Sequence, residues 1–370
     1  MGQDRAHLRD CQLNGRRIRP RIPRTGRAHG RVPSRRKQRG VALLVAILLV
    51  ALGTIIAATM AYNNAMTARR AGATFEFDQA LLVAEGAEAF AAYGLQQVAK
   101  QNSQYTYPGQ GWDRPMGPQE VTPGVTVEGS LEDLQGRFNI NNLVTADGET
   151  ANTAAIKAFQ RLLIRLGMDP KWADYIVDWI DKDTNPMFPD GAEDSVYMEM
   201  NPPYRSPNLP ITSTSELLAL PGFTRADFDR LSPYIVALPI GVQINVCSAS
   251  PYLLDALTGT EQFGADSEFQ KNRQDSGTCF PTPAQVQQAA SNLPGGGGGG
   301  VGGNSGAGGG IGQPGGGAQQ TLASLLVGKS SWFRLTTFVT LGNAEFSVYT
   351  LLYQDPTGNV RPVMRSFTPD

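Results

Sequence analysis

The chain has 370 residues, 41% of them hydrophobic, which is enough for one or two buried cores. Its formal net charge of −1 hides a sharp asymmetry, because residues 1–40 hold thirteen arginines or lysines and only two acidic residues. That segment carries +11, so the rest of the chain sums to −12. Both histidines, His7 and His29, lie in the basic segment. Histidine-dependent catalysis is therefore excluded from the rest of the chain, and we expect no ordinary zinc or copper site there.

An uncharged stretch of twenty-one residues, Val41–Ala61, directly follows the basic segment. At 1.5 Å of rise per residue, a helix of this length crosses a bilayer core of about 30 Å. The basic run Arg35–Arg39 marks the cytoplasmic side, so we expect the rest of the chain beyond the membrane. A plain signal anchor is the simplest alternative. A cleaved secretory signal fits less well, because the apolar run is long and no small-x-small site follows it.

Helical periodicity continues past the membrane segment to about Lys100. Apolar residues recur at steps of three and four and share one broad face: Ala80, Val83, Ala84, Ala87, Phe90, Ala91, Leu95 and Val98. One helix, half in lipid and half packed on a soluble domain, resembles the N-terminal helix of type IV pilins and pseudopilins. In that family a prepilin peptidase cleaves after a glycine and the new N-terminus is methylated. The resemblance implies cleavage after Gly40, with Val41 as the first mature residue.

The segment before Gly40 is longer than the usual leader of that family. Either this leader is long or the true start lies nearer Val32. Residues 1–30 are rich in arginine and proline without apolar periodicity, so we expect them to be disordered. Binding of nucleic acid is an alternative role for such a basic arm.

The remaining chain divides by composition. We expect a loop over Tyr105–Pro123, short strands at Val125–Glu128 and Arg137–Ile140, and mostly helical structure from Asn152 to Leu238. The predicted helices are Ala154–Leu166, Trp172–Asp181, Thr212–Leu220, Arg225–Tyr234, Ser250–Leu257 and Pro283–Ser291. Pro294–Gly317 reads as a flexible glycine-rich linker. Three strands separated by turns end the chain, at Trp332–Thr340, Ala344–Tyr353 and Val360–Phe367.

Several motifs in the middle of the chain resemble the minor pseudopilin K family of type II secretion systems. They are Gly136–Leu143 (GRFNINNL), Asp178–Asp183 (DWIDKD), Asp190–Asp194 (DGAED) with Tyr197, Tyr204-Arg205 with Asn208, Ser213–Leu217, and Ile244–Val246. The matches run in family order over nearly the whole chain after Gly40. The family implies an α+β, type IV pilin-like fold, in which a long N-terminal transmembrane helix packs on an antiparallel sheet that carries a large inserted α-helical domain.

These expectations give six segments. They are a basic cytoplasmic leader that is cleaved off (1–40), a transmembrane segment (41–61), a periplasmic helix with the first strands (62–145), an inserted helical domain (146–293), the glycine-rich linker (294–317) and the C-terminal strands (318–370).

The family also implies a place in an assembly. The chain would be a single-pass protein of the bacterial inner membrane, with its C-terminal domain in the periplasm. It would start the pseudopilus together with minor pseudopilins I and J, and the major pseudopilin would be a further partner. Ordinary pilins carry a glutamate at the fifth mature position, where this chain has Val45. A carboxylate in the bilayer core is costly unless it is paired. A subunit at the tip has no neighbour above it to provide that pairing.

Five carboxylates gather within fourteen residues: Asp181, Asp183, Asp190, Glu193 and Asp194. The first two have the spacing of oxygen ligands that opens a calcium loop, but Pro186 replaces the glycine of an EF-hand. From spacing alone, a solvated acidic loop fits as well as a calcium site. The family resemblance implies calcium at this block.

Cys247 and Cys279 are the only cysteines after the membrane segment. On the oxidising side of the membrane a disulfide between them is the default, and two unpaired buried thiols are the alternative.

Two other functions compete with an assembly role. No GxSxG motif occurs and no nucleophile or base accompanies the acidic block, so we expect no enzymatic activity. Segments around Glu216–Phe223 and Ile244–Leu254 look like helix-hairpin-helix elements, which would suit a DNA-uptake or type IV pilus minor pilin. The second glycine of that motif is Thr224 here, and the acidic chain lacks the charge for phosphate. We therefore expect no nucleic-acid partner.

Overall fold

The computed structural model describes residues 39–101, 104–264, 267–292 and 321–368. The leader up to residue 38 and the predicted linker at 294–317 lie outside these ranges. The described residues form two compact units, one ending at Ala68 and the other beginning at Arg69.

In the first unit, helix α1 (Arg39–Gln101) begins at the end of the basic segment. Among the described residues, one helix is long and apolar enough to cross a membrane, and its most apolar 18-residue window has a mean hydropathy of 2.9. Leucines, isoleucines and valines of the predicted membrane segment are all solvent-facing, which suits a segment surrounded by lipid. The structure thus supports a single N-terminal membrane anchor.

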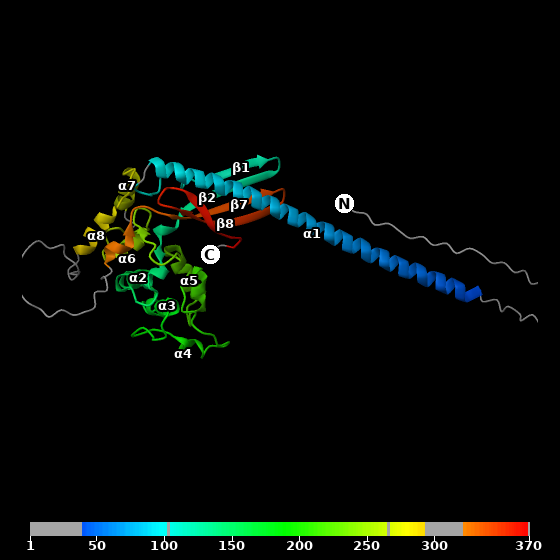
Figure 1. Cartoon of the computed structure of the whole chain (residues 1–370), viewed down its shortest axis with the longest axis horizontal. Coiled ribbons are helices and arrows are strands. Elements are labelled where there is room, and N and C mark those ends of the chain that lie inside the picture. The colour runs from blue at the N-terminus through cyan, green and yellow to red at the C-terminus, as the bar shows by residue number, and fades with distance from the viewer. Residues whose placement is uncertain (1–38, 102–103, 265–266, 293–320, 369–370) are drawn as a thin grey trace, which may run out of the picture. The chain divides into compact units, whose positions relative to one another are not determined.

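In the second unit, the C-terminal part of α1 packs along a sheet through small side chains (Figure 1). The buried residues of this face are Ala80, Ala84, Ala87, Ala91 and Leu95. Alanines let the helix approach the sheet closely, and they pack on strand residues such as Val127 and Val339. The predicted apolar face is confirmed for these residues, but Phe90, which was assigned to the same face, is 65% exposed.

The sheet has five antiparallel strands in the order β1-β2-β7-β8-β9. Their bounds are β1 Met116–Thr122, β2 Val125–Asp133, β7 Trp332–Leu341, β8 Ala344–Gln354 and β9 Val360–Ser366. β2 pairs with β7 from Val125 opposite Leu341 to Asp133 opposite Phe333. Everything between these two strands is thus an insertion into the sheet, and the predicted pilin-like fold with an inserted helical domain is confirmed.

Two strand predictions were wrong in detail. β1 lies inside Tyr105–Pro123, a segment whose prolines and glycines predict a loop. An edge strand tolerates such residues, since one side of its backbone needs no ladder partner, and the irregular register of β1 reflects this. The strand expected at Arg137–Ile140 is reduced to β3 (Phe138–Asn139), which pairs in parallel with β4 outside the main sheet.

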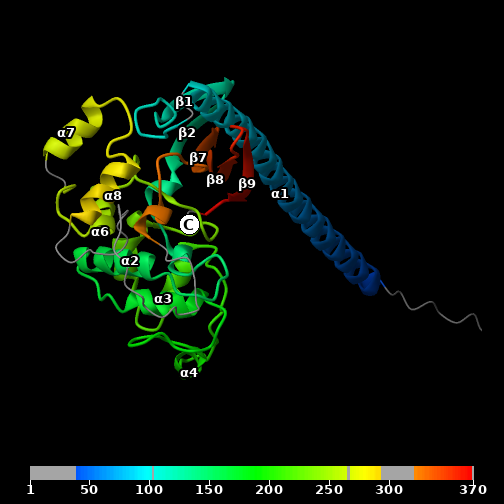
Figure 2. The same ribbon diagram turned by 60° about the vertical axis from the view of Figure 1, so that its left-hand side comes forward.

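The insertion is a set of short elements (Figure 2). Its helices are α2 Thr153–Arg165, α3 Trp172–Ile180, α4 Asp194–Tyr197, α5 Arg225–Leu231, α6 Pro251–Thr258, α7 Ser267–Asp275 and α8 Pro283–Ser291, with 3-10 turns η1 Leu134–Gly136, η2 Ile140–Leu143, η3 Thr214–Ala219, η4 Ser232–Tyr234 and η5 Leu322–Leu325. The short strands β4 Ile235–Val236, β5 Ile244–Asn245 and β6 Leu326–Val327 complete it. The predicted capping box of Ser213 and Glu216 is present, but it opens a 3-10 turn.

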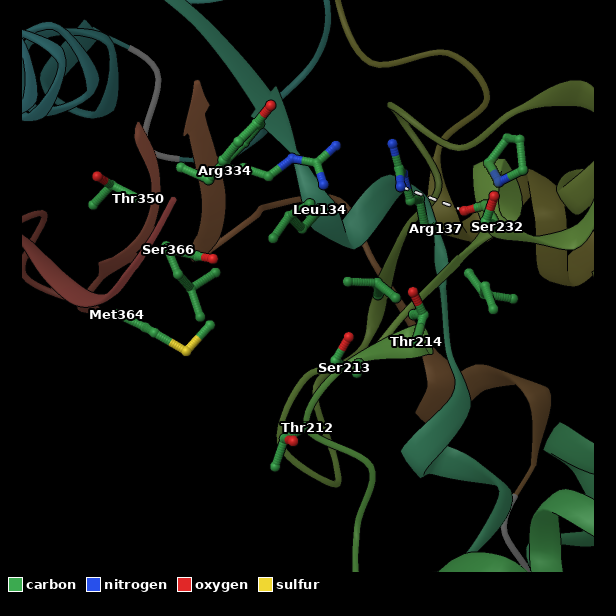
Figure 3. A pocket seen from close by; sticks show the side chains of 16 residues that line it. Leu134, Arg137, Thr212, Ser213, Thr214, Ser232, Arg334, Thr350, Met364 and Ser366 are labelled. Carbon is green, nitrogen blue, oxygen red and sulfur yellow. Dashed lines mark hydrogen bonds between the residues drawn. The ribbon is translucent and has the colours of Figure 1, made fainter. Parts of the chain in front are cut away.

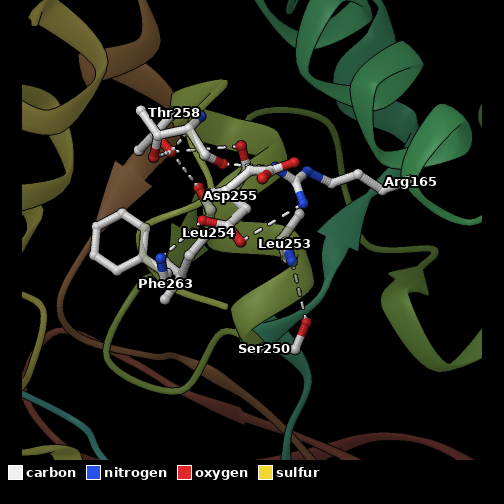
Figure 4. A network of polar contacts seen from close by, with 9 residues as sticks. Arg165, Ser250, Leu253, Leu254, Asp255, Thr258 and Phe263 are labelled. Atoms are coloured by element: carbon white, nitrogen blue, oxygen red, sulfur yellow. Dashed lines mark hydrogen bonds and ion pairs between the residues drawn. The ribbon is translucent and has the colours of Figure 1, made fainter. Parts of the chain in front are cut away.

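A buried ion pair joins α2 to α6 within the core of the insertion (Figure 4). Asp255 of α6 is 2% exposed and accepts a hydrogen bond from the backbone N–H of Phe263 at 2.9 Å. Arg165 of α2 lies 3.6 Å from the same carboxylate and donates to the Thr260 carbonyl at 2.6 Å. Because the buried carboxylate is paired and hydrogen-bonded, the core accommodates it.

A second polar cluster ties the insertion to the sheet. Asp133, at the end of β2, accepts from Asn245 Nδ2 at 2.9 Å, from Ser330 Oγ at 2.6 Å and from the Ser248 hydroxyl. Burial raises the pKa of Asp133, and these donors oppose that rise. A disulfide joins Cys247, two residues beyond Asn245, to Cys279.

Candidate functional site

The acidic block is organised by α3 and the loop that follows it. Asp178 lies on α3, is fully buried, and accepts hydrogen bonds from the backbone N–H of Met187 at 2.9 and 3.1 Å. The backbone N–H of Ala192 also donates to this carboxylate. One aspartate therefore folds the loop between residues 181 and 192 back onto the helix.

Three of the five predicted metal residues come together at this loop. Oxygen atoms of Asp181, Asp183 and Glu193 all lie within 4.8 Å of one another. Asp190 lies outside this group, and its backbone N–H donates to the carboxylate of Asp174. Asp194, also outside it, opens α4, accepts from the backbone N–H of Ser206 at 3.1 Å and lies 3.7 Å from the Arg205 guanidinium.

Several oxygens of this site are buried without a hydrogen-bond partner among the described residues. They are Oδ1 of Asp181, both Oε atoms of Glu193, and Oδ1 of Asn208. Asn208 donates through Nδ2 to the backbone carbonyl of Asp183 at 2.6 Å, so its unpartnered oxygen lies beside the acidic group. Buried polar atoms are normally satisfied, so unpartnered oxygens of Asp181 and Glu193 in this group fit a bound cation.

The raised pKa values of two of these carboxylates also favour a bound cation. Burial, with Asp183 and Asp178 nearby, raises the pKa of Asp181 to about 7. Burial, with repulsion led by Asp178 and Asp181, raises the pKa of Glu193 to about 7. The fold therefore holds like charges together at a free-energy cost that a cation would offset. The donors are carboxylate and amide oxygens without nitrogen or sulfur, and that set suits calcium.

Sequence reasoning did not single out Asn208 as a ligand or Asp178 as the organiser of the loop. Both lie in the motifs quoted above. The backbone of Asn208 adopts a φ of 47°, a left-handed conformation that asparagine tolerates better than most residues. An asparagine near an acidic block was the one available signal for a further oxygen ligand.

The proposed processing site and the helical hairpin also have defined positions. Gly40 and Val41 lie in the first turn of α1, and Val41 is solvent-facing. In the hairpin formed by η3 and α5, the side chains of Thr224 and Asp227 cap the start of α5. The Asp227 carboxylate accepts from the backbone N–H of Thr224 at 3.0 Å. The backbone N–H of Thr224, at the start of the second helix of this hairpin, is therefore already paired with a carboxylate.

Comparison with known proteins identifies the family of the chain. The family model for type II secretion system protein K matches residues 136–240. Type II secretion system protein K of Pseudomonas aeruginosa is 35% identical over 232 residues, which cover 60% of this chain and 69% of that protein. The chain belongs to the type II secretion system protein K family. The protein K of Klebsiella pneumoniae is also 35% identical, over 222 residues covering 58% of this chain and 68% of that protein.

A solved structure supports the fold of this protein K family member. A chain in the crystal structure of the GspK-GspI-GspJ complex from enterotoxigenic Escherichia coli has a TM-score of 0.61 and 20% identity, over 81% of this chain and 100% of that chain. At this identity the similarity shows a common architecture. The family itself is a component of a secretion apparatus.

Proposed function

We propose that this protein K is the minor pseudopilin that begins the pseudopilus and stays at its tip, for export of folded proteins across the outer membrane. The observation that carries this proposal is the neutral apolar segment of α1, with Val45 at the fifth position after Gly40. The carboxylate that an incoming pilin needs for pairing is absent there. The solved GspK-GspI-GspJ complex supports minor pseudopilins I and J as partners, and the major pseudopilin would follow them.

The proposed role is the assembly of subunits in the membrane. Prepilin peptidase cleaves after Gly40, α1 holds the subunit in the inner membrane by a single pass, and the rest of the chain lies in the periplasm. The alanine face of α1 is already covered by the sheet, so contacts with other pseudopilins fall to its exposed faces. The insertion enlarges the subunit, which would prevent a further subunit from stacking above it. No catalytic role and no nucleic-acid partner form part of this proposal.

Labelling of assembled filaments tests the tip position. A gold-conjugated antibody against the insertion, applied to pseudopili assembled with the full set of pseudopilins, should mark one end of each filament in electron micrographs. Label spread along the filament sides would contradict the proposal. Co-purification of pseudopilins I and J with the chain from detergent-solubilised membranes tests the partners separately, and its failure would contradict the assignment of I and J.

Calcium is the second part of the proposal. Asp181, Asp183 and Glu193, with Oδ1 of Asn208, would hold the ion, and Asp190 and Asp194 of the predicted set would support the loop around it. Binding of calcium supplies positive charge where like charges meet, so it should order the loop between α3 and α4. A stable insertion would in turn present a fixed surface to the neighbouring pseudopilins.

A DNA-uptake or type IV pilus minor pilin remains the alternative function. It would use the amides at the hairpin between η3 and α5. The capping carboxylate of Asp227 already occupies that position, and the chain after residue 40 is acidic. No feature of the described residues favours this alternative.

A further inference from the structure

A cavity lies between the main sheet and the insertion, away from the acidic block (Figure 3). Its volume is about 360 Å³, which falls within the usual range of about 300–1,000 Å³ for ligand pockets. The sheet contributes Arg334, Leu351 and Met364, while the insertion contributes residues 212–214, 232–233 and 235–237. The cavity is thus walled by segments that are far apart in sequence.

The two charged residues that line this cavity are both arginines, Arg137 and Arg334. Figure 3 shows their side chains on the same side of the cavity. Both reach the carboxylate of Glu132, with Arg334 Nη2 at 2.6 Å from Oε2 and Arg137 in contact with Oε1. One carboxylate therefore serves two guanidinium groups, which leaves one positive charge without a partner.

This excess charge is partly withdrawn from water. The side chains of Arg137 and Arg334 are only 23% and 21% exposed. An uncompensated charge in such surroundings is costly, and an added anion would remove that cost. Binding of a single negative charge beside the two arginines is therefore expected to be favourable.

The arginines also retain hydrogen-bond donors. A guanidinium has five N–H groups in a planar fork. Within the described part of the chain, Nε of Arg334 is buried and has no acceptor. Nη1 of Arg137 reaches the Ser232 carbonyl only at 3.5 Å, the long limit of a hydrogen bond. The Nη1 group of Arg137 can therefore still donate a charge-assisted hydrogen bond to a carboxylate.

We propose that the cavity binds an acidic side chain of a peptide segment from another protein. The single excess charge matches one carboxylate, whereas a phosphate would bring a second negative charge close to Glu132. Apolar walls formed by Ile235, Val236, Leu351 and Met364 would take apolar side chains beside the acid. The ligand class is therefore a segment with one glutamate or aspartate flanked by apolar residues.

Binding of peptide pools to the full-length chain in detergent micelles tests this proposal. One pool contains capped hexapeptides with glutamate fixed at the third position and alanine, leucine, valine or serine elsewhere, and the matched pool has glutamine at that position. The immobilised chain should retain the glutamate pool about tenfold better, since a charge-assisted contact is lost with glutamine. Equal retention of the two pools would overturn the proposal.

Two variants should move binding in opposite directions. Arg334→Gln removes the excess charge and should abolish the preference for glutamate, while Arg334→Lys should restore part of it. Glu132→Gln removes the competing carboxylate, so retention of the glutamate pool should rise. Arg225→Gln is the matched control, because this exposed arginine pairs with Asp229 at 2.8 Å outside the cavity, and it should change nothing. A fall in binding for Glu132→Gln, in a variant whose melting temperature is unchanged, would also overturn the proposal.

Discussion

The carboxylate of Asp178 occupies the space that a Cβ atom at position 191 would need, so only glycine fits at Gly191. The backbone N–H of Gly191 donates to the Met187 carbonyl at 2.6 Å, and Met187 itself donates to Asp178. The acidic loop is thus closed by a buried aspartate and a glycine that meet across it. This arrangement makes the loop sensitive to a single methyl group.

Gly191→Ala should therefore destabilise the insertion. The added methyl group overlaps Oδ2 of Asp178 and the backbone of Met187, and overpacking of this kind costs roughly 1–3 kcal/mol. The melting temperature should fall by several degrees in a thermal scan. Gly117→Ala is the matched control, because a Cβ there meets no atom within 4 Å, and it should melt like the wild type. Equal melting of the two variants would contradict the closed-loop arrangement.

Calcium should raise the melting temperature of the chain in detergent. The ion binds the native loop and offsets repulsion among carboxylates, so it stabilises the folded state increasingly as its concentration rises. Asp183→Ala with Glu193→Ala should abolish the rise, and Asn208→Ala should weaken calcium binding by removing one oxygen. Asp229→Ala on α5 is the control, and calcium should raise its melting temperature as it does for the wild type.

Two results would contradict the assignment of calcium to the acidic block. If chelation leaves both melting and resistance to protease unchanged, the calcium assignment is wrong. If calcium stabilises the double variant as much as the wild type, the ion binds somewhere other than Asp181, Asp183 and Glu193.

Periodicity and turn residues predicted most of the elements of this fold. The long apolar helix, the helices α2, α3, α6 and α8, and the three C-terminal strands lie within a few residues of their expected bounds. In α2, α3, α6, β7 and β8 an apolar face at a regular spacing coincides with a buried face. The family motifs additionally predicted the insertion, which local patterns alone do not reveal.

The elements that sequence missed depend on tertiary contacts. α7 is highly polar, and it is held by Arg273, which donates to the carbonyls of Cys247 and Ala249 at 2.6 and 2.9 Å. β1 is stabilised by its pairing with β2. The role of Asn208 depends on a loop that returns to Asp183 from 25 positions along the chain. Such contacts leave no local pattern in the sequence.

The disulfide should contribute to stability and leave no free thiol in the mature chain. Cys247 and Cys279 enclose a loop with a sequence separation of 32, and a crosslink of that length stabilises by roughly 3–4 kcal/mol. The double variant Cys247→Ser, Cys279→Ser should melt at a lower temperature than the wild type. In the wild type, thiol titration under denaturing, non-reducing conditions should detect only Cys11 of uncleaved precursor. Two further thiols would contradict the disulfide.

Processing should depend on Gly40. In the pilin-like families that the helix resembles, cleavage follows a glycine, so Gly40→Asp, which puts a larger charged side chain there, should leave precursor in the membrane. N-terminal sequencing of the wild type should begin at Val41. Gly53→Ala, within the same apolar helix, is the control and should be processed normally. Mature protein from the Gly40→Asp variant, or a wild-type N-terminus well beyond Val41, would exclude this site.

Val45→Glu should impair assembly because it places a carboxylate in the bilayer without a partner. An acidic residue costs about 2.5–3.5 kcal/mol at the centre of a membrane helix on insertion scales, and the cost at Val45, nearer the end of the segment, is below this value. If the chain begins the pseudopilus, no subunit lies above it to provide the pairing amine, so that cost is not recovered. Secretion by cells that carry this variant should fall, while Val45→Leu, which keeps the segment apolar, should secrete normally. Undiminished secretion with Val45→Glu would mean that the carboxylate finds a partner in the membrane, and a position at the start of the filament would then lose its physical basis.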